Sequence, residues 1–273
     1  MVCLSRNINA TPPSKIRHQF YIPAVPAGTM KKLTLLLVLV LVSSAYAAPM
    51  SAPRIHLKDG TSTNWAGYAV ETSLAKPQSA VTDVKGSWTV PAADCSVTPT
   101  AYSSFWIGID GYSSNTVEQI GTDSDCSSGK PQYYAWYEMY PKFPSNLRMT
   151  VKPGDVMTAE VKYNANGKFL LTITDTTTGA SFSTTQNGKS AKRSSAEWIA
   201  EAPSSGGVLP LADFGTAQFQ GASATLNGHT GTISDTSWQK DALTMATSSG
   251  VTKALPSSLS PDGSAFSVTW QHS

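Results

Sequence analysis

Carboxyl groups set among aromatic side chains are the feature of this sequence that most suggests chemistry. They occur in Phe105–Gly111 (FWIGIDG), Tyr133–Pro141 (YYAWYEMYP) and Ala196–Glu201 (AEWIAE), and a fourth segment, Val117–Asp123 (VEQIGTD), adds an amide to the acids. An aromatic wall removes water from a neighbouring carboxyl group, which raises its pKa and suits it to general acid–base catalysis. These four segments are therefore the candidate active-site segments.

Other catalytic classes find little support. A serine hydrolase needs a positioned histidine, but His56 lies in an N-terminal lead-in, His229 follows a turn, and His272 is the penultimate residue. No G-x-S-x-G, H-E-x-x-H or calcium-loop pattern occurs, and the cysteines and histidines do not have zinc-site spacing. We expect no metal and no other cofactor.

Strand alternation would place acids and aromatic rings on one surface. In a strand, Trp136, Glu138 and Tyr140 share a face, and Glu197 shares one with Glu201. From the pattern alone a second interpretation is equally open, in which the rings fill a core and the glutamates lie on the opposite, solvated face.

Short apolar–polar alternations separated by turn residues begin at about Thr61 and are typical of an all-β sandwich or barrel. The clearest is Ala159–Tyr163, Asn166–Gly167 and Phe169–Thr174, because Asn-Gly supplies the positive φ angles of a tight hairpin turn. Further strands are expected at Asn64–Val70, Val84–Val90, Ser103–Ile109, Gln132–Tyr140, Ala196–Glu201, Ala217–Leu226 and Ala265–Gln271. No helical period, repeat or linker interrupts residues 61–273, so one β domain is expected there.

The first 47 residues are expected to be removed. A basic start at Met30–Lys32, an apolar run at Leu33–Val42 and an A-x-A site at Ala45–Ala47 describe a secretory signal peptide. The run is shorter than the roughly 20 residues of a membrane span, so the mature chain is expected to be secreted and free of the membrane. The stretch before Met30 is unusual for a signal and suggests that translation starts at Met30. Residues 48–60 form a polar lead-in, either a short propeptide or a frayed terminus.

Signal removal changes the charge and the cysteine content. The whole chain has 20 Lys and Arg and 18 Asp and Glu, and residues 1–47 hold five of the basic residues and no acid, so the mature chain carries a formal charge of −3. It lacks the basic stripe that nucleic acid requires, and we expect a monomer. Cys95 and Cys126 remain. In an exported chain they are expected to form a disulfide closing a loop of about 30 residues and worth about 3–4 kcal/mol, the alternative being two free thiols.

Five boxes in order resemble the glutamic peptidases, also called eqolisins. They are N-W-A-G-Y (Asn64–Tyr68), W-I-G-I-D-G, E-Q-I-G-T, Y-A-W-Y-E-x-Y-P and A-E-W-I-x-E, and the resemblance covers about residues 61–273. It implies an all-β fold, an antiparallel β-sandwich of two large sheets with a concanavalin- or lectin-like architecture and a substrate cleft on the concave sheet. It also implies a pepstatin-insensitive endopeptidase that acts in acid on protein or peptide substrates without a cofactor.

The resemblance assigns the catalytic pair to Gln119 and Glu201, with Glu197 as the second choice for the glutamate. It assigns supporting cleft positions to Trp106, Asp110, Asp123, Trp136, Glu138 and Tyr140. In the expected chemistry, ionised Glu201 takes a proton from the attacking water and returns it to the leaving amine. The side-chain N–H of Gln119 donates to the oxyanion.

Two positions depart from the fungal members of the family. Tyr134 stands where an Asp precedes A-W-Y-E, and Met139 stands where a second Trp follows the glutamate. The long fungal propeptide is also missing, which suggests a prokaryotic branch. Two other functions stay open. One is a glycoside hydrolase using Glu138 and Glu201, which leaves Gln119 without a task, and the other is a carbohydrate-binding module.

Overall fold

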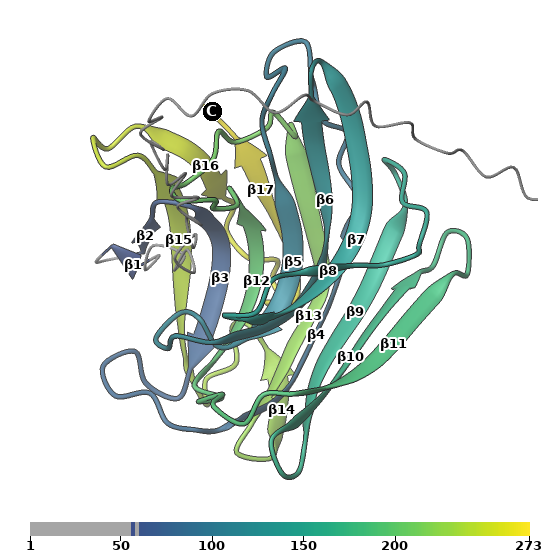
Figure 1. The fold of residues 1–273 in the computed structure, drawn as a ribbon. Coiled ribbons are helices and arrows are strands. Elements are labelled where there is room, and N and C mark those ends of the chain that lie inside the picture. Colours follow the sequence, from purple (N-terminus) through teal and green to yellow (C-terminus); the bar gives the residue numbers. More distant parts are fainter. Residues whose placement is uncertain (1–55, 58–59) are drawn as a thin grey trace, which may run out of the picture. The chain divides into compact units, whose positions relative to one another are not determined.

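The computed structural model describes residues 56–57 and 60–273, and in these it contains 17 strands and no helix (Figure 1). The predicted signal peptide, and all of the lead-in except His56, Leu57 and Gly60, lie outside the described residues. Among the named strands every pairing is antiparallel except that of β2 with β15. The all-β prediction is confirmed.

Two sheets form the sandwich. The first, which we call the front sheet, has the order β15 (Gln239–Ala246), β3 (Trp65–Glu71), β12 (Ser195–Glu201), β5 (Ser104–Ile109), β6 (Val117–Ser127), β7 (Lys130–Tyr140) and β8 (Ser145–Asn146). The second, the back sheet, has the order β11 (Ser181–Asn187), β10 (Lys168–Asp175), β9 (Val156–Asn164), β4 (Val81–Thr89), β13 (Thr216–Leu226), β17 (Phe266–Trp270) and β16 (Thr252–Pro256), with β14 (His229–Thr232) also on β13.

Strand β15 joins the two sheets, since it pairs with β3 of the front sheet and with β16 of the back sheet. The short strand β2 (Thr61–Ser62) lies parallel to β15, and β1 (His56–Leu57) pairs with β2.

The hairpin of β9 and β10 shows how sequence sets the local structure. Asn166 and Gly167 have φ angles of 67° and 71°, and the two strands are in register from Lys168 opposite Asn164 to Asp175 opposite Met157. The side chains of β10 alternate between buried and more exposed, as expected for a sheet with one face on the core and one in water. The prediction of this hairpin is confirmed.

The core fills the space between the sheets and is crossed by two tryptophans in opposite directions. Trp198 of the front sheet donates its indole N–H to the carbonyl of Lys85 on β4, at 2.7 Å. Trp88 of the back sheet donates to Oγ1 of Thr122 on β6, at 2.9 Å. Gly86 makes this packing feasible, because a Cβ there would lie 2.9 Å from the Trp198 ring. Both rings are fully buried and have satisfied N–H groups.

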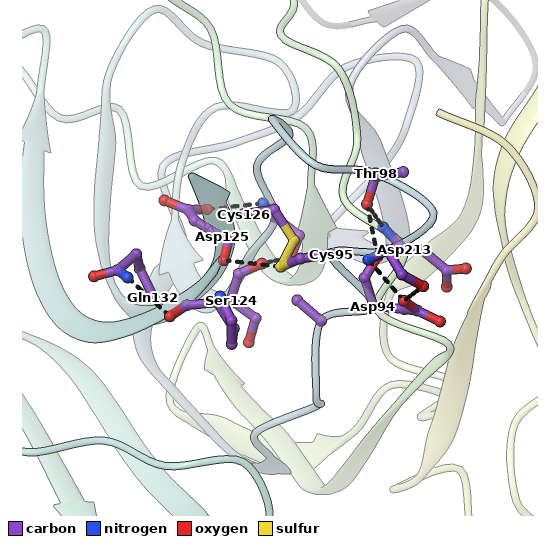
Figure 2. The surroundings of a disulfide bond; sticks show 12 residues. Asp94, Cys95, Thr98, Ser124, Asp125, Cys126, Gln132 and Asp213 are labelled. Atoms are coloured by element: carbon purple, nitrogen blue, oxygen red, sulfur yellow. Dashed lines mark hydrogen bonds between the residues drawn. A yellow bond between two sulfur atoms is a disulfide. The ribbon is translucent and has the colours of Figure 1, made fainter. Parts of the chain in front are cut away.

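A disulfide joins Cys95 and Cys126, as predicted (Figure 2). It ties the loop before β5 to the far end of β6, the central strand that carries Gln119. The same loop is held by the backbone N–H of Asp94, which donates to the carbonyl of Asp213 at 2.7 Å. The end of β6 is thereby fixed to two connecting segments.

The front sheet differs from the back sheet in its burial. Strands β3 and β5 are buried at every position, and β12 at every position except Glu201. One face of these strands meets the core. The other, which we call the outer face, carries a separate hydrophobic cluster that includes Trp65, Trp106, Trp136 and Ile199.

Candidate active site

Cross-strand register brings the candidate side chains together on the outer face of the front sheet. Three neighbouring rows run across β12, β5, β6 and β7: Glu201–Ser104–Asp123–Tyr134, Ile199–Trp106–Gly121–Trp136 and Glu197–Gly108–Gln119–Glu138. Paired residues of one row project from the same face of a sheet. Acids and aromatic rings therefore share one surface, and the interpretation that placed them on opposite faces is wrong.

Gln119 and Glu138 are direct partners across β6 and β7. The side-chain Nε2 of Gln119 donates to Oε2 of Glu138 at 2.6 Å. Burial raises the pKa of Glu138 to about 7, and the hydrogen bond from Gln119 lowers it in part. The Oε1 atom of Gln119 is buried and accepts no hydrogen bond from the described residues. This amide therefore keeps an acceptor and a second N–H for another molecule.

Glu201 ends β12 and is held by two donors. Its Oε2 accepts from the indole N–H of Trp106 at 2.7 Å, and its Oε1 accepts from Nδ2 of Asn64 at 3.1 Å. Burial raises the pKa of Glu201 to about 8, and the charges of Glu138 and Asp123 contribute to this rise. The three carboxyl groups therefore interact, although they come from three strands.

Two glycines make room for Trp106 between these groups. A Cβ on Gly121 would lie 2.6 Å from the Trp106 Cβ, and one on Gly108 would lie 3.0 Å from its Cζ3. The Trp106 ring also meets Trp65 edge to face, with centroids 4.9 Å apart at 76°. The glycines of W-I-G-I-D-G and E-Q-I-G-T thus allow the indole to lie along the sheet and reach Glu201.

The next acids along β6 bind aromatic donors from β7. Asp123 accepts from the indole N–H of Trp136 at 2.5 Å, and Asp125 accepts from the hydroxyl of Tyr134 at 2.7 Å. Burial, followed by the charge of Asp125, raises the pKa of Asp123 to about 7. Tyr140 packs on the same aromatic cluster. Tyr134, at a position that departs from the fungal pattern, therefore holds a neighbouring acid.

Asp110 belongs to a different group of side chains. Its carboxylate accepts from the backbone N–H groups of Arg193 at 2.7 Å and Ser194 at 2.9 Å, and from the hydroxyls of Ser194 at 2.9 Å and Thr116 at 3.4 Å. Asp110 is fully buried and has a φ of 73°, in the left-handed region. Its bonds fix the turn before β12. The structure does not bring Asp110 into contact with Gln119 or Glu201.

Glu197, the second choice for the catalytic glutamate, lies beside this turn. It is fully buried, and burial holds its pKa well above the usual range, with the charges of Asp110 and Glu71 adding to the shift. Glu118 also interacts with Asp110, and burial followed by the charge of Asp110 raises the pKa of Glu118 to about 9. We call Glu71, Asp110, Glu118 and Glu197 the sealed cluster.

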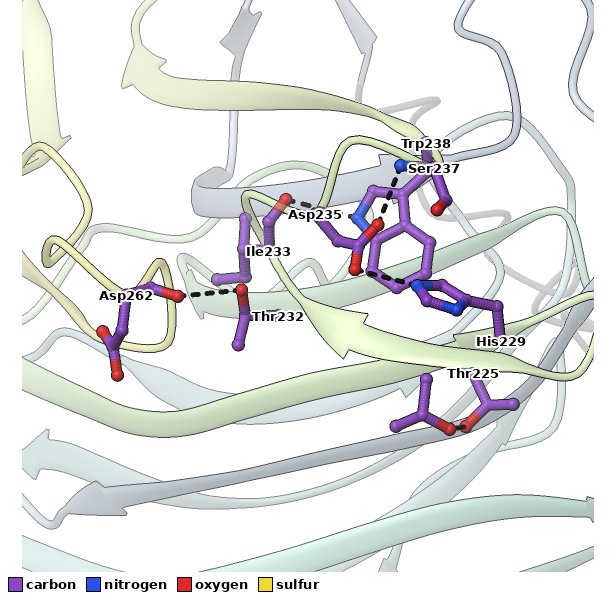
Figure 3. A network of polar contacts seen from close by, with 9 residues as sticks. Thr225, His229, Thr232, Ile233, Asp235, Ser237, Trp238 and Asp262 are labelled. Carbon is purple, nitrogen blue, oxygen red and sulfur yellow. Dashed lines mark hydrogen bonds and ion pairs between the residues drawn. The ribbon is translucent and has the colours of Figure 1, made fainter.

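His229 is not part of either group. It lies on β14, where Nε2 pairs with Oδ2 of Asp235 at 2.9 Å and the ring faces Trp238 (Figure 3). These contacts hold the connection from β14 to β15, because Asp235 also accepts from the backbone N–H of Ser237.

A family comparison agrees with this geometry. The sequence model of the Peptidase A4 family matches residues 63–261, which contain all four candidate segments. The chain belongs to the Peptidase A4 family. The resemblance to glutamic peptidases is thereby confirmed.

Individual relatives point the same way. Aspergillopepsin-2 of Aspergillus niger is 34% identical over 134 residues, 47% of this Peptidase A4 chain and 48% of the relative. The chain therefore spans about half the length of the curated relative it matches. The crystal structure of aspergilloglutamic peptidase from Aspergillus niger matches with 29% identity and a TM-score of 0.56, over 63% of this chain and 99% of that chain. Scytalido-glutamic peptidase with a peptide-based transition state analog shares the fold, with a TM-score of 0.64 and 24% identity over 77% and 98% of the two chains.

Several polar residues of this Peptidase A4 site were not predicted from the sequence. Asn64 was recognised only as part of a box, although it binds Glu201. Tyr112, in the loop after β5, donates to Asp241 at 2.7 Å, and Ser113 donates to Glu71. Each pair joins segments far apart in the chain, so only the strand register could have revealed it.

The described part of the Peptidase A4 chain holds no group of three or more His, Cys, Asp or Glu that could bind a metal ion. Within the same residues, no helix is long and apolar enough to cross a membrane.

Proposed function

We propose that this chain is a secreted endopeptidase that hydrolyses peptide bonds in acid with Gln119 and Glu201. The observation that carries the proposal is the Glu201 carboxyl, which is partly exposed, held by Asn64 and Trp106, and coupled to Glu138, the partner of Gln119. A polar acid–amide pair on an aromatic surface fits a peptide, which presents a carbonyl for attack and side chains for packing.

The protonation state of Glu201 determines the order of the proton transfers. Because burial raises its pKa to about 8, Glu201 carries its proton in acid, and the reaction begins with that proton rather than with the ionised base expected from the sequence. The proton passes to the scissile carbonyl oxygen, and the resulting carboxylate takes a proton from the water that attacks the carbonyl carbon. Glu201 then protonates the amide nitrogen as the C–N bond breaks, and a hydroxyl proton of the diol returns to Glu201. Water is consumed and the enzyme is regenerated.

Gln119 acts on the scissile carbonyl oxygen while the proton from Glu201 is transferred to it. One N–H of its Nε2 is used by Glu138, which leaves the other to donate to that oxygen. The free acceptor Oε1 can hold the attacking water. As a neutral group, Gln119 performs this task without adding a charge to three coupled carboxyl groups.

The aromatic cluster is proposed to bind the substrate. Tyr140 is partly exposed on the outer face with Glu138, and the buried rings of Trp106 and Trp136 pack behind this surface. The relative crystallised with a peptide-based transition state analog supports a peptide ligand for this fold. Asp110 was expected among the binding residues, but its four hydrogen bonds favour a structural role.

Export is proposed from the sequence of residues 30–47, and the Cys95–Cys126 disulfide fits an oxidising compartment. Mass spectrometry of the secreted protein would define its first residue and show whether residues 48–60 are retained. Recovery of the chain only inside the producing cell would overturn this part of the proposal.

The function is tested with two polymers. The purified protein is incubated with denatured casein and with a glucan at about pH 4 and about pH 8, with and without pepstatin and a chelator. We expect casein cleavage at the lower pH that resists both inhibitors. Cleavage of the glucan alone, or no cleavage with tight glucan binding, would replace the peptidase by one of the carbohydrate functions.

A further inference from the structure

Asn64 is the second hydrogen-bond donor to the Glu201 carboxyl, and it lies in the bend just before β3, whose first residue, Trp65, pairs with Glu201. Its Nδ2 reaches Oε1 of Glu201, the oxygen that Trp106 does not bind. Asn64 is fully buried, and its backbone carbonyl accepts from the N–H of Ala202, which follows Glu201 in the chain. With one donor on each oxygen, the carboxyl is fixed in rotation, and each oxygen still has a lone pair for a proton or a water.

The hydroxyl of Ser62 determines which way the Asn64 amide points. Its oxygen accepts from the backbone N–H groups of Asn64 at 3.3 Å and Trp65 at 3.0 Å. Both lone pairs are then used, so the hydroxyl proton is left to donate, and it faces Oδ1 of Asn64 at 3.4 Å. With Oδ1 directed to Ser62, the NH2 group of Asn64 is directed to Glu201.

The segment that carries Ser62 is itself bound to the front sheet. Ser62 pairs in parallel register with Met245 of β15 and in antiparallel register with His56 of β1. The carbonyl of Gly60 accepts from the backbone N–H of Thr244 at 2.7 Å. The segment that precedes Asn64 is therefore held to β15.

We propose that Asn64, oriented by Ser62, is a positioning residue that fixes the Glu201 carboxyl for proton transfer. This inference rests on the proposed function and names a further residue for the same site. Asn64 binds the Glu201 carboxyl and is not proposed to touch the substrate, so its effect is exerted through the angle and the acidity of that carboxyl.

The groups around Glu201 determine in which direction loss of Asn64 changes the acidity of Glu201. Glu138 from β7 and Asp123 from β6 disfavour its ionised form, and the indole of Trp106 favours it. The Asn64 N–H acts in the same direction as the Trp106 indole, because a donor stabilises a carboxylate more than a carboxylic acid. Loss of this donor should make Glu201 a weaker acid.

Two substitutions of similar size separate positioning from packing. Asn64→Leu removes the donor at every pH, and Asn64→Asp keeps a donor only while its own carboxyl is protonated. We expect the Leu variant to lose about 10–100-fold in kcat with little change in KM. The Asp variant should stay within a few fold of wild type at about pH 3 and lose activity as the pH rises through the pKa of the new carboxyl. Asn164→Leu and Asn164→Asp, at the exposed end of β9, serve as matched controls.

A titration of Glu201 that does not depend on activity completes the test. The ¹³C shift of the labelled Glu201 carboxyl, assigned by its loss in Glu201→Gln, should show an ionisation constant at least about tenfold smaller in Asn64→Leu than in wild type. An unchanged titration and unchanged kcat overturn the role of Asn64, and so do equal losses in both variants at every pH. If the wild type itself cleaves no peptide at any pH, the proposed function fails as well, whatever the titration shows.

Ser62→Ala tests the orientation separately. It should lower kcat by less than Asn64→Leu does. The kcat of the double variant should be no lower than that of Asn64→Leu alone. Full additivity of the two losses would overturn the link between Ser62 and Asn64.

Discussion

Two groups of acids lie on neighbouring parts of the front sheet and use their carboxyls differently. In the first, Glu201 and Glu138 accept only from neutral N–H donors, are partly exposed and lie among aromatic rings. In the sealed cluster, Glu197 is fully buried and Asp110 is satisfied by the backbone of its own turn. Burial alone therefore does not distinguish a reactive acid from a structural one, because raised pKa values occur in both groups. Solvent access does distinguish them, since Glu201 and Glu138 are partly exposed and Glu197 is fully buried.

Glu201→Gln is expected to have the largest effect. The amide keeps the size of the side chain but cannot donate and recover the acid proton, so kcat for a peptide should fall at least about 10³-fold at acid pH. Stopped assays with a labelled peptide measure the loss, and near-UV circular dichroism checks the fold. Glu160→Gln, on the back sheet beside Lys85, is the control and should retain full activity. A Glu201→Gln variant that kept about a tenth of wild-type activity would remove Glu201 from the chemistry.

Gln119→Ala should be the next most damaging. It removes the N–H proposed to donate to the scissile carbonyl oxygen in the transition state, and loss of such a donor typically costs about 10²–10³-fold in kcat. It also frees Glu138, so its pKa should rise, because the hydrogen bond from Gln119 lowers it. Gln132→Ala, at an exposed position on β7, is the matched control. If both alanine variants have the same kcat, Gln119 has no catalytic task.

Asp110→Ala, unlike the two preceding substitutions, should lower the stability of the fold and leave the activity of the folded protein unchanged. It leaves the backbone N–H groups of Arg193 and Ser194 without their acceptor, at a cost of about 2–4 kcal/mol in the free energy of unfolding. Urea unfolding at about pH 5 measures this loss. The KM of the folded fraction should stay the same. A higher KM with unchanged stability would instead restore the expectation that Asp110 binds substrate.

The all-β fold, and which site side chains share a face of their strand, were predictable from the sequence. The hydrogen-bond partners of the site side chains were not. The Asn166–Gly167 hairpin and the shared face of Trp136 and Glu138 follow from short-range patterns, and the structure has both. Strands β6, β11 and β15 were not predicted. The sequence of β11 is rich in Ser and Thr and has little apolar alternation. The bond from Asn64 to Glu201 spans 137 residues, so no local pattern encodes it. Such contacts depend on register across several strands.

The sealed cluster should make the folded state less stable as pH rises. Burial raises the pKa of Glu118 to about 9 and that of Glu71 to about 7, whereas both would titrate near 4.5 when unfolded. Between these values the folded state binds more protons than the unfolded state, so the free energy of unfolding falls by up to about 1.4 kcal/mol per pH unit for each group. Both contributions are fully present below about pH 4.5.

Urea unfolding at about pH 4, 6 and 8 measures this slope, and Glu118→Gln should reduce it. At lower pH the sign reverses. The pKa values of Asp235 and Asp262 are lowered to about 2 by hydrogen bonds from His229 and Ser260, respectively, so their stabilising effect is lost as pH falls from about 4 to about 2. Stability that rises steadily from about pH 4 to about pH 8 would contradict the protonated state of the sealed cluster.

The most direct measurement compares the two glutamates of β12 in one assay. Glu197→Gln and Glu201→Gln lie four residues apart on the same strand and face, and kcat/KM is measured for each at about pH 4, per folded molecule. We predict that Glu197→Gln keeps kcat/KM within a few fold of wild type and that Glu201→Gln loses nearly all of it. The opposite result, activity lost with Glu197 and kept without Glu201, would move the reaction to the sealed cluster and contradict the account.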